Sequence, residues 1–251
     1  MRTSADPAEL AELFAADRDT HLYGLADLEE PFWSNSTWYR DGLAVVGVVS
    51  VGDRWVTGYA MSRVAPDETL ELLAEIHDEI PSGTWVTGPI GMFEAMSPVR
   101  PARDIGAHWR MILDEPVAVA GSTQALPLGP DDLDALVDLH ASDQGRAFFL
   151  PAMLAGNPFV GIWDDGRLVA SAGTHVASLR HGVAAVGAVI TRPSHRGQGL
   201  GTRVTAALCR MLADDYETVG LNVEIGNAPA LRLYDRLGFR SVFQYEEIQL
   251  L

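Results

Sequence analysis

Apolar side chains in the first part of the chain recur with the two periods that distinguish helices from strands. Residues 8–28 carry leucine and phenylalanine at helical spacing and predict an opening helix. Residues 43–62 hold two apolar runs separated by Gly52 and Asp53, which predicts two strands joined by a turn. Residues 65–80 begin with proline and acids and predict an amphipathic helix with a negatively charged first turn. Further strands are predicted at residues 84–90 and 108–114.

A break in composition at residues 115–130 separates these elements from a second series. Residues 129–141 predict a helix begun by a proline, and residues 159–178 predict a hairpin that turns at Asp165–Gly166. The remaining elements are a strand at 182–193, a helix to about 215, a strand at 219–225, a helix at 228–237 closed by Gly238, and a strand at 243–251. This order predicts an α/β protein with a mixed central sheet flanked by helices, and with parallel neighbouring strands around residues 186–212.

The break also predicts two domains, residues 1–118 and residues 119–251. Both halves follow the order helix, hairpin, helix, strand, which indicates a duplicated α/β unit.

Composition and charge restrict the environment and the partners. With 251 residues, 47% of them apolar, the chain can bury a substantial core. It has no apolar window long enough for a membrane helix, and its start lacks the layout of a secretion signal, so we expect a cytoplasmic protein. The formal charge of −16 opposes nucleic acid and anionic membranes as partners. Cys209, the single cysteine, is predicted to be buried on a helix, and the histidines show no metal-ligand pattern, so we expect no metal.

The candidate chemistry lies where an apolar strand meets three glycines and then a helix, in the segment RPSHRGQGLG. Such a loop presents backbone amides at a helix N-terminus, where an anion is stabilised. A dinucleotide fingerprint fails on spacing, because Thr202 occupies the third glycine position. A nucleoside triphosphate loop fails because the segment has no lysine.

A third pattern fits: Arg196, Gly199 and Gly201 in the form R-x-x-G-x-G after a strand end. It resembles the acyl-coenzyme A signature of the GNAT superfamily of N-acyltransferases. The resemblance implies that consecutive amides of the loop hold the pyrophosphate of coenzyme A, with Arg196 as the cation. The loop residues matched to this role are Arg196, Gly197, Gln198, Gly199, Leu200, Gly201 and Thr202.

A second segment, residues 221–239, resembles the other conserved stretch of the same superfamily. It supplies in register Asn227, Ala230, Leu233, Tyr234, Gly238 and Phe239. The resemblance covers about residues 126–251. It therefore implies two GNAT-like halves, of which only the C-terminal one carries the acyl-coenzyme A motif, a plan similar to that of glycine N-acyltransferases.

The resemblance also assigns roles around the donor. The strand before the loop should bulge away from its neighbour, so that main-chain groups of Val189, Ile190 and Thr191 pair with the pantetheine arm. An amide there can face the thioester oxygen. Asn227 and Ala230 are expected to contact the cofactor, although Asn227 is also placed to cap the last helix.

Tyr234 matches the family residue that serves the departing thiolate. A phenol has a pKa of about 10 and a thiol one of about 8.5, so full proton transfer is uphill by about 2 kcal/mol and hydrogen bonding is an alternative role. Two residues are candidates for the base that deprotonates the acceptor. Glu224 is expected to be partly buried, which would favour its neutral form, and His175 lies on a central strand. His195 is expected to flank the cofactor.

The resemblance implies an N-acyltransferase that moves an acetyl group from acetyl-coenzyme A to a primary amine of a small molecule by direct attack. The sequence leaves open whether the chain forms a homodimer. Two rivals remain at this stage: a noncatalytic acyl-coenzyme A sensor, and an acyltransferase with an aminoacyl-tRNA donor.

Overall fold

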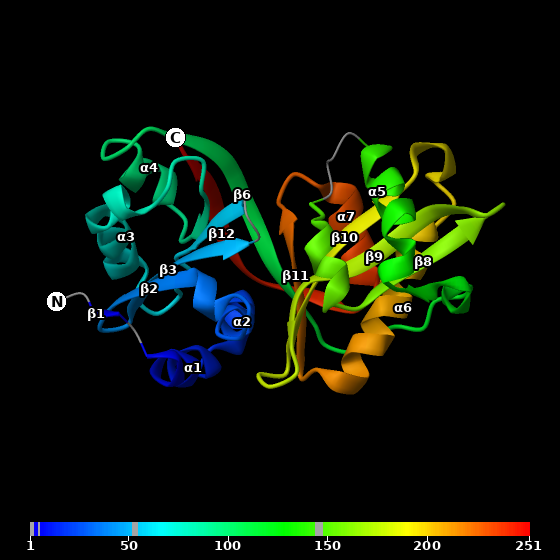
Figure 1. Cartoon of the computed structure of the whole chain (residues 1–251), viewed down its shortest axis with the longest axis horizontal. Helices are drawn as coiled ribbons and strands as arrows, with labels where there is room; N and C mark the ends of the chain where they lie inside the picture. The colour runs from blue at the N-terminus through cyan, green and yellow to red at the C-terminus, as the bar shows by residue number, and fades with distance from the viewer. Residues whose placement is uncertain (1–2, 5, 52–54, 144–147) are drawn as a thin grey trace. The chain divides into compact units, whose positions relative to one another are not determined.

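The computed structural model describes residues 3–4, 6–51, 55–143 and 148–251, and its contacts divide the chain into two compact units (Figure 1). The first unit comprises Met1–Arg110, Val223–Asn227 and Ser241–Leu251. The second unit comprises Met111–Asn222 and Ala228–Arg240. The chain therefore passes between the units more than once, and the domain boundary at residues 118 and 119 stays a prediction.

The first unit opens with two helices where a single helix was predicted. Helix α1 spans Pro7–Ala15 and α2 spans Arg18–Asp27. The expectation of one helix is wrong because Asp17 caps α2: its carboxylate accepts hydrogen bonds from the amide and the hydroxyl of Thr20, at 3.4 and 2.8 Å.

The sheet of the first unit is mixed. Its strands are β1 (Thr3–Ser4), β2 (Ser36–Asp41), β3 (Ala44–Val51), β4 (Trp55–Tyr59), β5 (Trp85–Gly88) and the C-terminal part of β12 (Phe239–Leu250). Neighbours pair in that order, with β4 and β5 parallel and the other pairs antiparallel. The predicted turn at Gly52–Asp53 lies outside the described residues.

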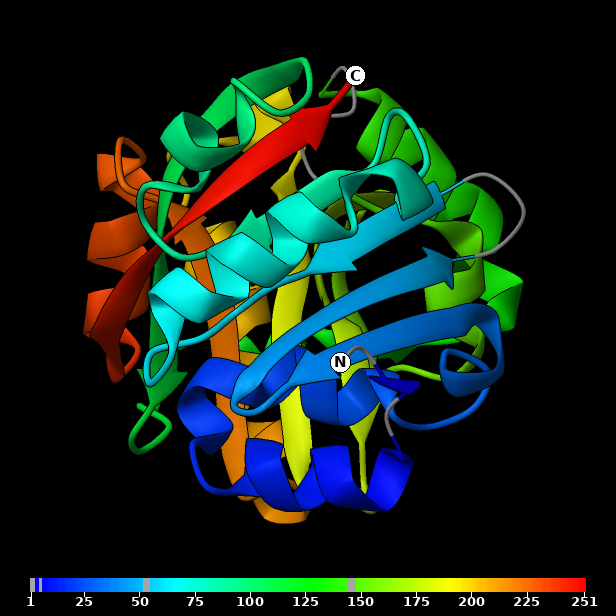
Figure 2. The same cartoon turned by 90° about the vertical axis from the view of Figure 1, so that its left-hand side faces the viewer.

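Helix α3 (Pro66–Glu75) packs on β3 (Figure 2), followed by the short helix α4 (Met92–Met96) and by β6 (Ala102–Leu113). Leu72 and Leu73 of α3 enter a core that also contains Val46, Val86 and Ile248. The amphipathic helix is thus confirmed, although its α-helical part ends at Glu75.

The second unit repeats this arrangement. Its elements are β7 (Leu126–Leu128), α5 (Leu133–Ala141), β8 (Phe159–Asp164), β9 (Arg167–Ser178), β10 (Val183–Thr191), α6 (Leu200–Asp215), β11 (Thr218–Glu224, of which the last two residues belong to the first unit) and α7 (Ala228–Arg236). Strands β7 to β10 pair antiparallel in sequence order, whereas β10 and β11 are parallel, which confirms the predicted parallel neighbours. The hairpin turn is confirmed too, since Asp165 and Gly166 both have positive φ, +48° and +73°.

The two units share an order of elements: three antiparallel strands, a helix, and a strand parallel to the third. In the first unit this series is β2, β3, β4, α3 and β5, and in the second it is β8, β9, β10, α6 and β11. The predicted mixed sheet flanked by helices is thus present in each unit. Cys209 is buried on α6, as expected. No helix in the described part of the chain is long and apolar enough to cross a membrane.

Candidate active site

Strand β10 has a bulge directly before the glycine loop. Its parallel register with β11 runs from Val183 to Val186, and its antiparallel register with β9 shifts between Gly187 and Ile190. Within the shift, Ala188 has a positive φ of +48°, which is uncommon for a residue other than glycine. The bulge implied by the resemblance is therefore present. Val189 lies within it, and the backbone of Ile190 and Thr191 follows it.

His175 of β9 contacts this bulge. The Ala188 amide donates a hydrogen bond to His175 Nε2 at 3.2 Å. The imidazole also covers Gly187, where a Cβ would lie 2.3 Å from Nε2. Burial lowers the pKa of His175 to about 4, although a hydrogen bond with the Phe148 backbone acts in the opposite direction. The Nε2 lone pair already has a partner within the chain, so the role of His175 as a base stays a prediction.

The glycine loop has an open backbone. Gly197 and Gly199 have φ values of +77° and +74°, and a Cβ at either position would meet nothing within 4 Å. Residues 196–199 are exposed. Gly199 is the N-cap of α6 and has no side chain to cap it, so the first amides of α6, at Leu200, Gly201 and Thr202, lie at the positive end of the helix.

Gly201 has a different role from the two glycines before it. A Cβ there would lie 3.4 Å from Thr191 Oγ1 and 3.8 Å from Leu233 Cδ1. A Cβ at the start of α6 would therefore be in van der Waals contact with the end of β10 and with one side chain of α7, the helix that carries Ala230 and Tyr234.

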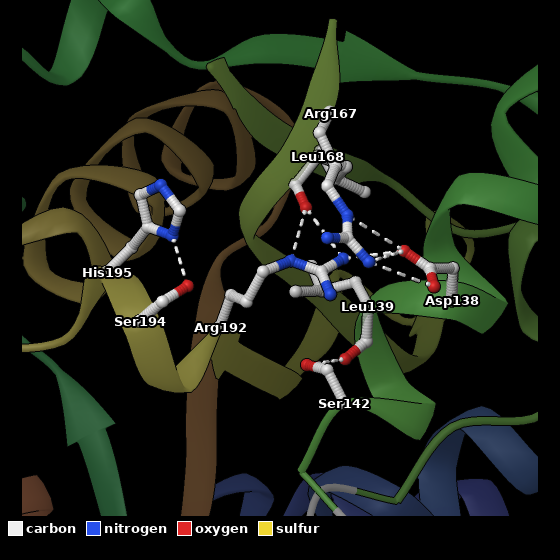
Figure 3. A network of polar contacts seen from close by, with 8 residues as sticks. All are labelled: Asp138, Leu139, Ser142, Arg167, Leu168, Arg192, Ser194 and His195. Carbon is white, nitrogen blue, oxygen red and sulfur yellow. Dashed lines mark hydrogen bonds and ion pairs between the residues drawn. The ribbon is translucent and has the colours of Figure 1, made fainter. Parts of the chain in front are cut away.

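A polar network holds the first residues of the loop (Figure 3). Arg192 is buried and donates to Asp138 Oδ2 at 2.7 Å and to the Leu168 carbonyl at 3.2 Å. Hydrogen bonds from Arg192 and then Arg167 lower the pKa of Asp138. Arg192 was not identified from the sequence as a residue that supports the loop. The feature that could have indicated this role is the position of an arginine at the end of an apolar strand.

The side chains of His195 and Arg196, later in the loop, also have partners within the chain. Nη2 of Arg196 forms an ion pair with Asp143 Oδ2 at 2.6 Å, and its Nε donates to the Thr191 carbonyl at 3.3 Å. The ring of His195 lies 2.9 Å from the Ser194 hydroxyl and 3.3 Å from Asp164. A phosphate at the loop would therefore compete with Asp143 for Arg196.

Tyr234 is half-buried on α7. Its ring meets Phe239 edge to face, with centroids 5.7 Å apart. Burial, with a smaller effect of Cys209, raises the pKa of Tyr234 to about 12. The phenol therefore keeps its proton at neutral pH and can donate a hydrogen bond.

Glu224 and Asn227 belong to the first unit, and the structure does not place them relative to Tyr234 or the glycine loop. The expected partial burial of Glu224 is wrong, because its side chain is exposed at the end of β11. The Asn227 amide donates to the Glu224 carbonyl at 3.0 Å. Their roles in catalysis and in cofactor binding stay predictions.

The corresponding region of the first unit differs in three ways. Helix α3 begins with Asp67 and Glu68, which would repel an anion at its N-terminus. Strands β4 and β5 stay paired beyond Tyr59, since the Ala60 amide donates to the Thr87 carbonyl at 2.8 Å. Met92 packs where β5 ends, and a Cβ on Gly88 would lie 2.6 Å from its sulfur. Among the residues described, the bulged strand and open glycine loop occur together in the second unit alone.

Comparisons with known proteins agree with this arrangement. A family model described as FR47-like protein matches residues 160–248. Mycothiol acetyltransferase from Tsukamurella paurometabola is 42% identical over 76 residues, which are 30% of this chain and 26% of that protein. Mycothiol acetyltransferase from Acidimicrobium ferrooxidans is 32% identical over 140 residues, which are 55% of this chain and 43% of that protein. Each match spans less than half of the relative's length.

A solved structure extends the likeness to the whole chain. The crystal structure of a GCN5-related N-acetyltransferase-like protein from Streptococcus suis covers 98% of both chains, with a TM-score of 0.64 and 15% sequence identity. At this identity the likeness concerns the fold, and it confirms the predicted GNAT architecture. The shared fold, the family model and the two relatives support the GNAT superfamily that the sequence motifs predicted.

Proposed function

We propose that the chain is an N-acyltransferase that moves an acetyl group from acetyl-coenzyme A to a primary amine of a small molecule. The observation that carries the proposal is the open glycine loop at the start of α6, which directly follows the bulged end of β10. The superfamily and the names of the relatives support the same reaction class.

The chain's own residues fit the donor. Amides from Gly197 to Thr202 would hold the pyrophosphate, with Arg196 as the cation once it leaves Asp143. Main-chain groups of Val189, Ile190 and Thr191 would pair with the pantetheine arm as an added strand does. Asn227 and Ala230 remain proposed contacts. When bound, the donor supplies a thioester that is open to attack by a neutral amine.

Tyr234 would hydrogen-bond the departing thiolate rather than transfer its proton fully, because its raised pKa makes it a weak acid. Glu224 is the proposed proton acceptor for the incoming amine. Its exposed carboxylate can pass the proton on to solvent.

The class of acceptor is proposed from the net charge of the chain and from the names of the two relatives. The relatives' name points to a small-molecule acceptor, and the net charge of −16 favours a cationic or neutral amine over a nucleic acid. Amino acids, polyamines and amine-bearing natural products form the class to be screened. We propose that the reaction takes place in the cytoplasm.

The test is a thiol-release screen over such amines, with acetyl and longer acyl donors. The proposal expects amine-dependent release of coenzyme A. If saturating acetyl-coenzyme A raises Tm while no amine releases thiol, the chain is a sensor rather than an enzyme. Binding to aminoacyl-tRNA that weakens with salt would instead favour a tRNA-linked donor.

A further inference from the structure

We propose that His175 is a positioning residue of this acyl transfer: it holds the bulge of β10 by accepting the Ala188 amide, and so fixes the backbone that presents the donor. The expected effect on acyl transfer rests on the proposed function, whereas the contact between His175 and Ala188 rests on the geometry of β9 and β10.

The bulged residue Ala188 requires a hydrogen-bond acceptor for its amide, and His175 provides one. Ala188 lies inside the register shift, where it has no register partner on β9, and a buried amide without a hydrogen-bond partner costs about 1–3 kcal/mol. Ala188 also has φ +48°, a conformation that persists only where its surroundings impose it. His175 Nε2, 3.2 Å away, provides the partner from the neighbouring strand.

The sequence of β10 is adapted to this ring. A Cβ on residue 187 would lie 2.3–2.4 Å from three atoms of the imidazole, so only glycine allows the ring to reach the Ala188 amide. Phe148 also contacts the ring, edge to face, with ring centroids 5.6 Å apart. Gly187, Ala188 and His175 therefore form one unit.

The protonation state of the His175 ring suits a hydrogen-bond acceptor and does not suit a general base. Because burial lowers the pKa of His175 to about 4, the imidazole is neutral at physiological pH, with the proton on Nδ1 and the lone pair on Nε2. That lone pair is used by Ala188. An Ala188 amide held in this way cannot also bind the thioester oxygen, which leaves that function to the amides of residues 189–191.

Two substitutions separate positioning from the alternatives. His175→Gln keeps an acceptor near the place of Nε2, whereas His175→Phe keeps an aromatic ring of similar size and removes the acceptor. We expect His175→Phe to lower kcat by about tenfold to a hundredfold, because small displacements of a reacting group are costly. The KM for acetyl-coenzyme A should change by less than about threefold, and His175→Gln should recover most of the loss in kcat.

Each other outcome contradicts the proposal. Equal loss of kcat in both variants would indicate that the imidazole acts as a base. Normal kcat in His175→Phe would mean that the ring only fills space.

A measurement without turnover separates this inference from the proposed reaction. Hydrogen exchange at the Ala188 amide should accelerate at least about tenfold in His175→Phe, yet stay close to the wild-type rate in His175→Gln. Both variants should retain the wild-type Tm within a few degrees, which shows that they fold. Unchanged exchange in a folded His175→Phe overturns the inference, whereas absent turnover in the wild type together with the expected exchange overturns only the proposed reaction.

Discussion

At the scale of single residues, the hydroxyl of Tyr234 gives a direct test of the proposed chemistry. Tyr234→Phe removes one hydrogen bond to a developing thiolate, and a bond to a charged group contributes about 1.5–3 kcal/mol. We therefore expect kcat to fall by roughly tenfold to a hundredfold while the Kd for coenzyme A changes little. Stopped-flow turnover and calorimetric binding measure the two effects.

The matched control for this substitution is Tyr39→Phe. It removes a hydroxyl that donates to Glu79 on the surface of the first unit, at 2.7 Å. Turnover of Tyr39→Phe should equal that of the wild type. If Tyr234→Phe also turns over normally, Tyr234 has no role in the reaction.

Asp27 leads to a prediction about stability. It is buried at the end of α2, and burial raises its pKa from 3.8 to about 8. Between these values the native state keeps a proton that the unfolded chain releases, so the stability contributed by this group is present at low pH and is lost as the pH rises. Asp27→Asn removes this dependence, and its Tm relative to the wild type should increase from about pH 5 to about pH 9.

The comparison is the wild type measured beside Asp27→Asn at each pH, and its Tm should fall relative to that of the variant as the pH rises toward the pKa of Asp27. A Tm difference for Asp27→Asn that stays flat across the pH range would mean that the carboxyl is ionised in the native state.

At this scale the sequence could indicate a backbone free of Cβ atoms at Gly197 and Gly199, and the structure shows both with positive φ and open space around them. Their role in holding coenzyme A stays a prediction. The contacts of His175 could not be predicted, because they depend on a register shift between two strands. Glu224 was expected to be partly buried, but strand alternation alone does not show whether the end of a strand is covered.

At the scale of elements, the glycine loop can be tested by adding a side chain. Gly199→Val places a branched side chain in the open space above the amides and forces it into the left-handed region, which costs of the order of 1–3 kcal/mol. We expect the Kd for coenzyme A to rise at least about tenfold, since the amides are blocked, in a protein that still folds.

Gly42→Val controls for the backbone strain. Gly42 also has positive φ, +60°, and open space around it, and it lies in a turn of the first unit. It should lower Tm by a similar amount and leave the Kd unchanged. If Gly199→Val binds coenzyme A normally, the loop is not the pyrophosphate site.

Most elements could be predicted because their apolar periods persist over many residues. Their ends could not, because single residues decide them. Asp17 divides the predicted first helix by capping α2. Gly238, with φ +92°, lets the chain pass from α7 almost directly into β12, which therefore begins four residues before the predicted strand.

At the scale of the whole molecule, the repeated fold predicts one donor site for each chain. The second unit has the bulge and the open loop, whereas α3 begins with acids and β4 stays paired with β5. Calorimetric titration should give one coenzyme A per chain, and Gly199→Val should weaken that single event. A second binding event that survives Gly199→Val would show that the first unit also binds the donor.

The burial of Cys209 has a practical consequence. It is the single cysteine of the chain, it is 1% exposed on α6, and burial raises the pKa of its thiol to about 12. The thiolate form of a cysteine attacks a disulfide reagent and displaces one of its sulfurs, so the buried, protonated Cys209 of the folded protein should not react with it. A coloured disulfide reagent can therefore measure the coenzyme A released during turnover without reacting with the folded enzyme. In denaturant, the same reagent measures the rate at which α6, the helix that follows the glycine loop, unfolds and exposes Cys209.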